Sequence, residues 1–228
     1  MGDPEQLLLQ GCYDEEQLAQ QLFDLYYAPL HYLLPVLVLF ITGQEPEATR
    51  RRLIRNSLID STLSMDPYIE RTREAVRKIY YTLGNASLLG DVSFGLVAFR
   101  DNPDSAAPGL DYLTRTYVNL EQGRDAASFL SRVNSVRAST VSSRDFVEDA
   151  YAGVKQAIET LDWSDYAARY IVLITDAGAR DADDPLSSTG MGAESLRKLA
   201  QDKGIAIFVL HLLTPATMAN HAADAAQY

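Results

Sequence analysis

The stretch LIDSTLSMDPYIERTREAV, residues 58–76, joins a short apolar run to an amphipathic helix. Pro67 fits the first turn of that helix, and apolar residues follow at helical spacing along one stripe. Four oxygen-bearing side chains stand between the two elements: Asp60, Ser61, Thr62 and Ser64. A loop between a strand and a helix needs only a turn residue and an N-cap. The surplus of oxygen donors therefore indicates a binding role for this loop.

The composition is that of a globular, acidic protein. Of the 228 residues, 47% are hydrophobic and 22% are charged, so extensive disorder is not expected. Acidic residues outnumber basic ones by 31 to 20, which gives a formal net charge of -11. Such a field repels phosphate backbones and argues against nucleic-acid binding. The single cysteine, Cys12, excludes an internal disulfide.

Residues 1–50 differ from the remainder of the chain and are interpreted as a helical or apolar segment or a linker. They contain the most apolar run of the sequence, LLPVLVLFI at 33–41. A membrane-spanning helix needs about 20 apolar residues, and Pro35 interrupts this shorter run. We therefore expect a buried strand or core helix here and no membrane insertion.

From residue 58 onward, expected strands and helices alternate. Strands are expected at 57–60, 92–101, 116–120, 170–178 and 205–213, and helices at 67–83, 126–136, 143–161 and 193–204. This alternation predicts an α/β domain with a mostly parallel central sheet and helices on both faces. The domain is assigned to residues 51–228. Its last stretch begins a helix and stops, so we expect a truncation at the C-terminal end.

Two of the expected strands end in aspartate, Asp60 and Asp176. Ligands of such folds bind at the carboxyl ends of the strands. Thr62 and Ser64 follow Asp60 at steps of two, a spacing that aims alternate side chains of an extended loop to one side. Carboxylates with hydroxyls are hard oxygen donors, which suit Mg²⁺ or Mn²⁺. The alternative is that Asp60 and Thr62 only cap the following helix.

Four stretches together resemble a von Willebrand factor A domain over residues 53–215. They are LIDSTLSM, VSFGLVAFRD, SRDFVEDAYAGV and YIVLITDAG, in that order and spacing. The resemblance implies a Rossmann-like fold with a metal-ion-dependent adhesion site. It makes Asp60, Thr62 and Ser64 direct ligands of Mg²⁺, and matches Asp176 to a later aspartate that often acts through water.

The sequence departs from the family in two places. Where the family has a site threonine before the middle helix, this chain has Ser142, Ser143, Asp145 and Glu148, with Thr140 as a lower-ranked candidate. Asp145 or Glu148 could substitute as a metal ligand, and an added carboxylate would weaken attraction for an acidic partner. The strand before Asp60 carries polar residues at 52, 55 and 56, so it is expected to be short or to begin at the sheet edge.

The functional expectation is a non-enzymatic binding module. Within the family, the chain resembles bacterial members, most of all the C-terminal region of serine/threonine kinases that regulate type VI secretion. It lacks the kinase catalytic motifs. The resemblance implies a sensing or partner-binding region in which a protein partner completes the metal shell with an acidic or other oxygen ligand. Such a region would lie at the periplasmic or the cytoplasmic face of a bacterial inner membrane.

Two other functions remain open from the sequence. The metal site could be vestigial, with the domain acting by surface pairing alone. A Mg²⁺-dependent phosphohydrolase of the haloacid-dehalogenase type would need a carboxylate two residues after Asp60, where Thr62 stands, although Asp183 and Asp184 mimic its later acidic pair. The histidines are scattered along the sequence, and His211 is interpreted as a satisfied core residue.

Overall fold

The computed structural model describes residues 52–85, 92–104, 109–143, 145–164, 166–215 and 217–228. All of them belong to one unit of the chain, Glu45–Tyr228. Segment 1–50, its apolar run at 33–41, Cys12 and His31 lie outside the described residues. No helix in the described ranges is long and apolar enough to cross a bilayer.

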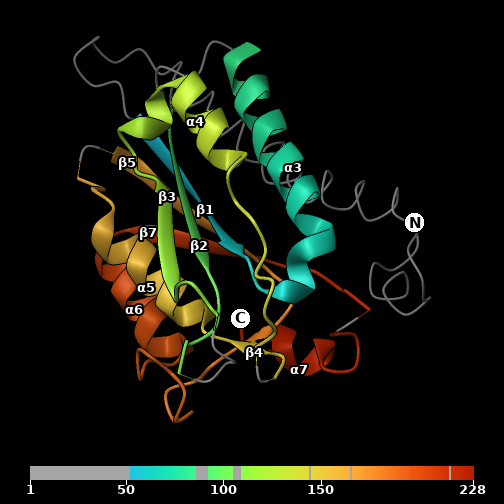
Figure 1. Cartoon of the computed structure of the whole chain (residues 1–228). Helices are drawn as coiled ribbons and strands as arrows, with labels where there is room; N and C mark the ends of the chain where they lie inside the picture. Colours follow the sequence, from blue (N-terminus) through green and yellow to red (C-terminus); the bar gives the residue numbers. More distant parts are fainter. Residues whose placement is uncertain (1–51, 86–91, 105–108, 144, 165, 216) are drawn as a thin grey trace, which may run out of the picture. The chain divides into compact units, whose positions relative to one another are not determined.

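A five-stranded sheet in the order β3-β2-β1-β5-β7 forms the centre of the described domain (Figure 1). β1 (Arg52–Asp60) pairs in parallel with both β2 (Val92–Phe99) and β5 (Tyr166–Thr175). β7 (Ile205–His211) extends the parallel sheet beyond β5, while β3 (Thr114–Val118) pairs antiparallel with β2. The expected α/β class with a mostly parallel sheet is confirmed.

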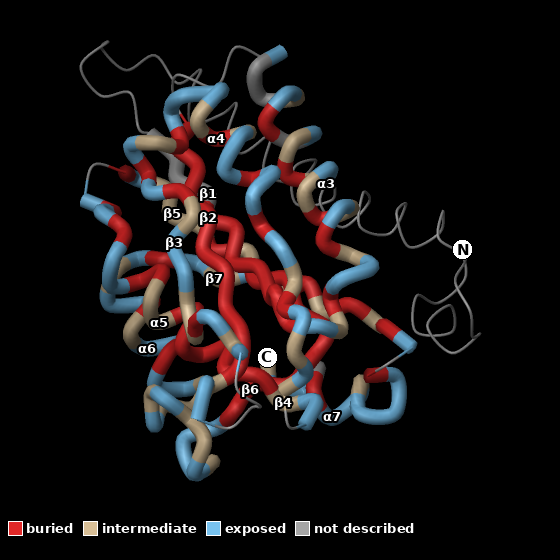
Figure 2. The backbone as a smooth tube through the Cα atoms, in the orientation of Figure 1, coloured by how far each residue is buried: buried red, intermediate tan, exposed pale blue. Residues whose placement is uncertain are grey.

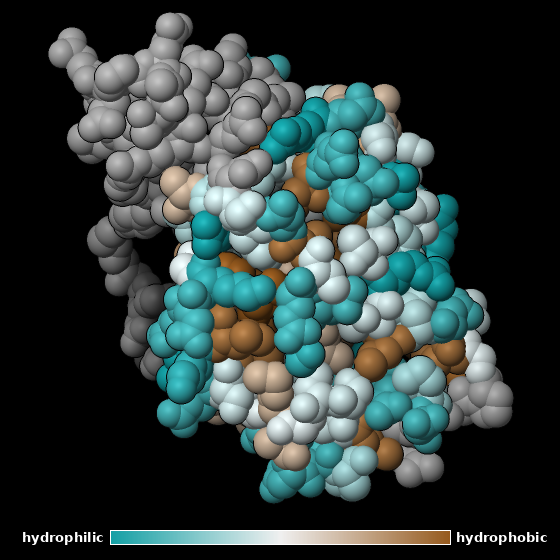
Figure 3. All heavy atoms as spheres, turned by 90° about the vertical axis from the view of Figure 1, so that its left-hand side faces the viewer, coloured by the Kyte–Doolittle hydropathy of each residue, from teal (hydrophilic) through white to brown (hydrophobic). Residues whose placement is uncertain are grey.

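Helices cover both faces of this sheet (Figure 1). α3 (Asp66–Asn85) and α4 (Ala126–Val133) pack on one face, and α5 (Ala150–Thr160) and α6 (Ala193–Asp202) on the other. Figure 3 views the side of α5 and α6, where hydrophilic residues cover most of the surface and apolar ones emerge between them. The amphipathic helices thus place their apolar stripes on the sheet.

Short elements complete the loops at the ends of the strands. They are η2 (Leu63–Met65), η3 (Gln122–Arg124), the parallel pair β4 (Val147–Glu148) and β6 (Gly178–Ala179), and α7 (His221–Ala225).

The core lies on both sides of the sheet, and β2 near its centre is buried along its whole length (Figure 2). Successive residues of a strand point to opposite faces. On the α3 side, the ring of Phe94 lies 5.1 Å from those of Tyr80 and Phe129. On the α5 side, Val97 and Phe99 join a cluster with buried residues of α5 and α6. Burying each such large side chain contributes about 1.5–3 kcal/mol, so β2 is held from both faces.

The expectation for the strand before Asp60 was wrong, because β1 is nine residues long and central. Its neighbours supply backbone hydrogen bonds along both edges, which override the polar sequence. Asn56 is fully buried, and neither of its side-chain polar atoms has a hydrogen-bond partner among the described residues. Gly95 on β2 leaves it room, since a Cβ there would stand 2.5 Å from Asn56 Oδ1.

The helix expected at 143–161 begins only at Ala150. Val147 and Glu148 instead form β4, which pairs with β6. The Arg180 N–H donates to the Glu148 carbonyl over 2.9 Å, so backbone pairing removes these residues from the helix.

A glycine in η3 gives the first testable prediction. Gly123 is buried against β2, and a Cβ there would lie 1.7 Å from the Phe94 carbonyl oxygen. We expect Gly123→Ala to lower the free energy of unfolding by about 3 kcal/mol or more, because backbone must move. Gly190→Ala is the control: φ there is +59° but its Cβ would meet nothing within 4 Å, so the loss should be about 1–2 kcal/mol. Urea unfolding measures both, and equal losses would contradict the close approach.

Candidate functional site

Two carboxylates and two hydroxyls converge at the carboxyl ends of β1 and β5. Asp60 is the last residue of β1, and Asp176 directly follows β5. The Ser64 hydroxyl donates to Asp176 Oδ1 over 3.0 Å, and the Thr62 hydroxyl donates to Asp60 Oδ1 over 2.6 Å. The Thr62 and Ser64 oxygens lie 3.2 Å apart. The structure thus brings together four of the six residues expected at the site, which we call the oxygen cluster.

Two further threonines donate hydrogen bonds to the carboxylates of the cluster, and a third contacts one of them. Thr175 donates through Oγ1 to Asp60 Oδ2 over 2.8 Å, and Thr214 donates to Asp176 Oδ2 over 2.9 Å. The Thr217 hydroxyl lies 2.9 Å from that of Thr214. The sequence analysis missed these residues. Thr175 precedes Asp176, and Thr214 follows a third parallel strand, so strand ends were the signal that could have found them.

Capping alone does not explain the loop. Thr62 is the N-cap of η2, but its side chain makes no capping hydrogen bond. Its hydroxyl is directed to Asp60 instead. The Asp60 carboxylate accepts a local hydrogen bond from the Thr62 N–H over 2.9 Å. It also accepts one from Thr175, which lies 115 residues later in the chain. The polar side chains therefore connect the loop after β1 to the end of β5 rather than cap a helix.

The cluster carries negative charge that the described ion pairs do not neutralise. Burial, and then the nearby charge of Asp176, raises the pKa of Asp60 to about 7. Burial likewise raises the pKa of Asp176. None of the ion pairs formed by described residues includes either carboxylate. A cation at this place would relieve both the burial cost and the repulsion.

Glu148 adds a third buried carboxylate beside the cluster. Its exposed fraction is 2%, and its Oε1 accepts the Ser143 hydroxyl over 2.8 Å. Its Oε2 has no hydrogen-bond partner within the described part of the chain. Burial, followed by the charge of Asp60, holds the pKa of Glu148 well above its ordinary value. Glu148 is therefore the candidate before α5, where the sequence departs from the family, that interacts electrostatically with the cluster.

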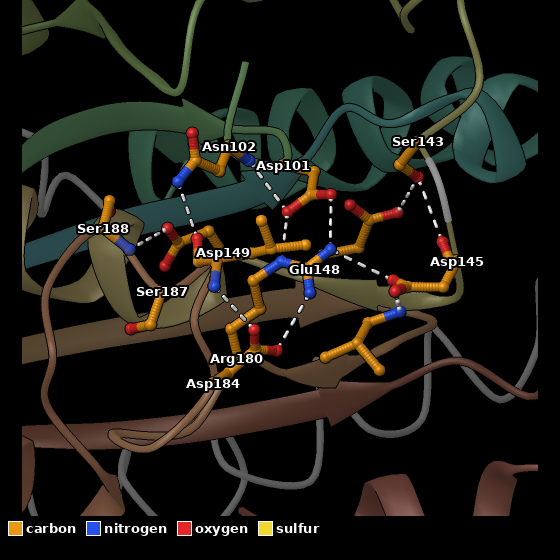
Figure 4. A network of polar contacts seen from close by, with 12 residues as sticks. Asp101, Asn102, Ser143, Asp145, Glu148, Asp149, Arg180, Asp184, Ser187 and Ser188 are labelled. Atoms are coloured by element: carbon orange, nitrogen blue, oxygen red, sulfur yellow. Dashed lines mark hydrogen bonds and ion pairs between the residues drawn. The ribbon is translucent and has the colours of Figure 1, made fainter. Parts of the chain in front are cut away.

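Asp145, the other candidate, is engaged elsewhere (Figure 4). Its Oδ1 accepts from Arg180 Nη2 over 3.0 Å, and its side chain is 45% exposed. Arg180 is buried and also donates to both oxygens of Asp101, over 2.6 and 2.7 Å, and to Asp184 over 2.9 Å. This ion-pair network joins three loops at the same edge of the sheet. Thr140 is exposed.

The donor set fits a hard divalent cation. Carboxylate and hydroxyl oxygens are the ligands that Mg²⁺ and Mn²⁺ prefer, and the unpartnered Glu148 oxygen leaves acceptor capacity unused. The cluster is not a carboxylate-rich or histidine centre: no three His, Cys, Asp or Glu side chains of the described residues are grouped to hold a metal ion. Any ion here would depend on hydroxyl and water ligands.

Two histidines that are distant in sequence meet near the end of the chain. The Nδ1 atoms of His211 and His221 lie 2.9 Å apart. Burial, and then the charge of His221, lowers the pKa of His211 to about 4. The interpretation of His211 as a satisfied core residue was wrong: it is partly exposed, and its buried Nε2 has no hydrogen-bond partner among the described residues.

Comparison with known proteins gives similarities to parts of longer proteins. No family model matches the sequence. An alpha-protein kinase, vwkA of Dictyostelium discoideum, is 26% identical over 120 residues, which cover 53% of this chain and 17% of the kinase. Two crystal structures of the pilus adhesin SpaC from Lactobacillus rhamnosus GG share the fold. The first, in an open conformation, is 16% identical with a TM-score of 0.50, and the match covers 70% of this chain and 24% of the adhesin. The second is 14% identical with a TM-score of 0.51, and the match covers 71% of this chain and 24% of the adhesin.

The buried Arg180–Asp101 pair gives a stability prediction. Arg180→Met removes the cation that donates to both oxygens of the buried Asp101 carboxylate and should cost about 3–5 kcal/mol of unfolding free energy. Adding Asp101→Leu should recover part of this loss, because it removes the fully buried carboxylate of the network and leaves only the more exposed Asp145 and Asp184. Lys155→Met, which breaks an exposed pair with Glu159, is the control and should cost less than about 1 kcal/mol. Similar costs for the two single variants in urea would contradict this role of Arg180.

The histidine pair gives a pH prediction. Because the pKa of His211 falls from 6.5 to about 4 on folding, its neutral form stabilises the fold above pH 6.5. That contribution is lost as the pH falls from 6.5 toward 4, where the unfolded chain takes up the proton first. His211→Phe removes this dependence. In buffer with a chelator, wild type should therefore lose more stability than the variant over this range, and parallel curves would refute the assignment.

Proposed function

We propose that the domain is of the von Willebrand factor A type and binds a protein partner through Mg²⁺ or Mn²⁺ held at the oxygen cluster. The observation that carries the proposal is the meeting of Asp60 and Asp176, both buried and linked through the Thr62 and Ser64 hydroxyls, with no ion-pair partner for either among the described residues. A divalent ion supplies the missing positive charge. Asp60, Thr62 and Ser64 are its proposed ligands, and Asp176 acts directly or through water.

The arrangement favours binding over phosphoryl chemistry. A phosphohydrolase built on Asp60 needs a general acid two residues later, and the Thr62 hydroxyl there donates to Asp60 itself. Of the later acidic residues, Asp184 pairs with Arg180 and Asp183 is exposed. Thr62 therefore occupies the position at which the reaction requires a carboxylic acid as general acid. We propose a module without catalytic activity of its own.

We further propose that this module is the sensing or partner-binding region of a larger bacterial signalling protein, such as a kinase that regulates type VI secretion. The partial similarity to an alpha-protein kinase, of which the chain spans 17%, is in line with a region of a larger protein.

Metal binding by the whole chain is the decisive test. Calorimetric titration with MgCl₂ or MnCl₂ should show one site, and saturating metal should raise Tm because the ion binds the folded state. Thr62→Val should weaken the affinity about tenfold or more, through loss of a ligand and of the hydrogen bond to Asp60. Asp66→Asn, which changes an exposed acidic residue at the start of α3, is the control and should bind as wild type.

Asp60→Asn separates a metal site from a structural carboxylate. Without metal, the variant should be at least as stable as wild type, because the repulsion from Asp176 is removed. With metal, only wild type should gain stability, so the order of the two Tm values reverses. Absence of metal binding by folded wild type at millimolar concentrations would reject the proposal and leave surface pairing with a vestigial site.

A further inference from the structure

Large apolar side chains are exposed on segments that adjoin the oxygen cluster and the ion-pair network in the sequence. Five large hydrophobic side chains are prominently exposed among the described residues: Leu63, Tyr81, Phe146, Phe208 and Met218, with exposed fractions of 41 to 57%. Tyr81 lies on α3 and Phe208 on β7. Of the other three, Leu63 begins η2, Phe146 directly precedes β4 and Met218 lies shortly before α7. We call Leu63, Phe146 and Met218 the apolar rim.

The hydrogen bonds of the site fix where these side chains stand. Leu63 lies between Thr62 and Ser64, within the loop that supplies the cluster. Ser64 bonds to Asp176, Asp176 to Thr214, and Thr214 to Thr217, the residue before Met218. One chain of side-chain hydrogen bonds therefore links Ser64, the neighbour of Leu63, to Thr217, the neighbour of Met218.

Phe146 is held through the neighbouring ion-pair network. Asp145, directly before it, bonds to Arg180 and to the Val147 N–H, and β4 follows. Loops fixed in this way lose little conformational freedom when a partner covers them. Exposed apolar side chains on ordered loops beside a polar centre are typical of a surface that binds another protein.

Charge selects the chemistry of the partner. Six carboxylates lie at this edge, against the two buried guanidinium groups of Arg100 and Arg180, so on formal charges a divalent ion would not cancel the excess: they are Asp60, Asp101, Asp145, Glu148, Asp176 and Asp184. A partner carboxylate would approach against this field, whereas an uncharged oxygen would not.

We propose that the apolar rim and the metal at the oxygen cluster together bind a segment of another protein in which apolar side chains flank an uncharged oxygen ligand. A main-chain carbonyl or the side chain of Ser, Thr, Asn or Gln supplies that oxygen, and the segment has no acidic residue at the contact. The inference rests on the proposed function, since the ion gives the neutral oxygen its attachment. The rim excludes water from that bond and supplies the apolar contact.

The test uses the whole chain and a random linear peptide library displayed on phage, selected with Mg²⁺ and eluted with a chelator. Enriched peptides should be rich in apolar residues and poor in Asp and Glu. A synthetic copy of an enriched peptide should bind wild type about tenfold or more tightly than the variant Leu63→Ser/Phe146→Ser/Met218→Ser. The variant Tyr81→Ser/Phe208→Ser removes exposed apolar side chains elsewhere and should bind the peptide as wild type.

Metal titration of the rim variant distinguishes the two proposals. It should bind Mg²⁺ as wild type does, because its ligands are unchanged. If metal binds but the enriched peptides need an Asp or Glu, or bind the rim variant equally well, or no peptide is enriched with Mg²⁺, this inference is overturned and the metal site stands. If wild type binds no metal, the proposed function fails first and the inference falls with it.

Discussion

The parallel pairing of β1 between β2 and β5 is the constraint on which the site depends. The register sets Ile59 opposite Ile174, so Asp60 and Asp176 leave adjacent strands at nearly the same level. Both carboxylates are then buried at the edge where helices and loops begin. Their mutual repulsion opposes this arrangement, and the hydroxyls of Thr62, Ser64 and Thr175 offset part of it by hydrogen bonding. The fold thus concentrates negative charge at a place that the core makes rigid.

Much of the fold followed from local patterns in the sequence. The apolar run 170–174 predicted a strand, and in β5 its residues Ile171, Leu173 and Ile174 are buried while Tyr170 and Val172 are partly buried. The stripe of residues along α3 predicted the buried face with Ile69, Thr72 and Val76. Patterns of this kind work because burial on one face of a regular element repeats with the period of that element.

The remainder depends on contacts between residues far apart in sequence. β1 reads as polar, and only its two neighbours and the space above Gly95 make a central strand of it. Val147 and Glu148 fit the spacing of α5, but pairing with β6 took precedence over helical periodicity. In the site, the strand-end aspartates could be predicted from topology. The burial of Arg180 could not, because no local pattern marks a partner that lies 79 residues away.

Glu148 occupies its place through the main chain rather than through its carboxylate. Pairing of β4 with β6 and the bond from the Arg180 N–H to its carbonyl set the position of its Cα, whatever atoms follow. The backbone position is therefore set independently of the Glu148 side chain, whose buried carboxylate in turn accepts the Ser143 hydroxyl. A change of Glu148 to Gln would therefore remove one titratable group beside the oxygen cluster and leave the β4–β6 pairing in place.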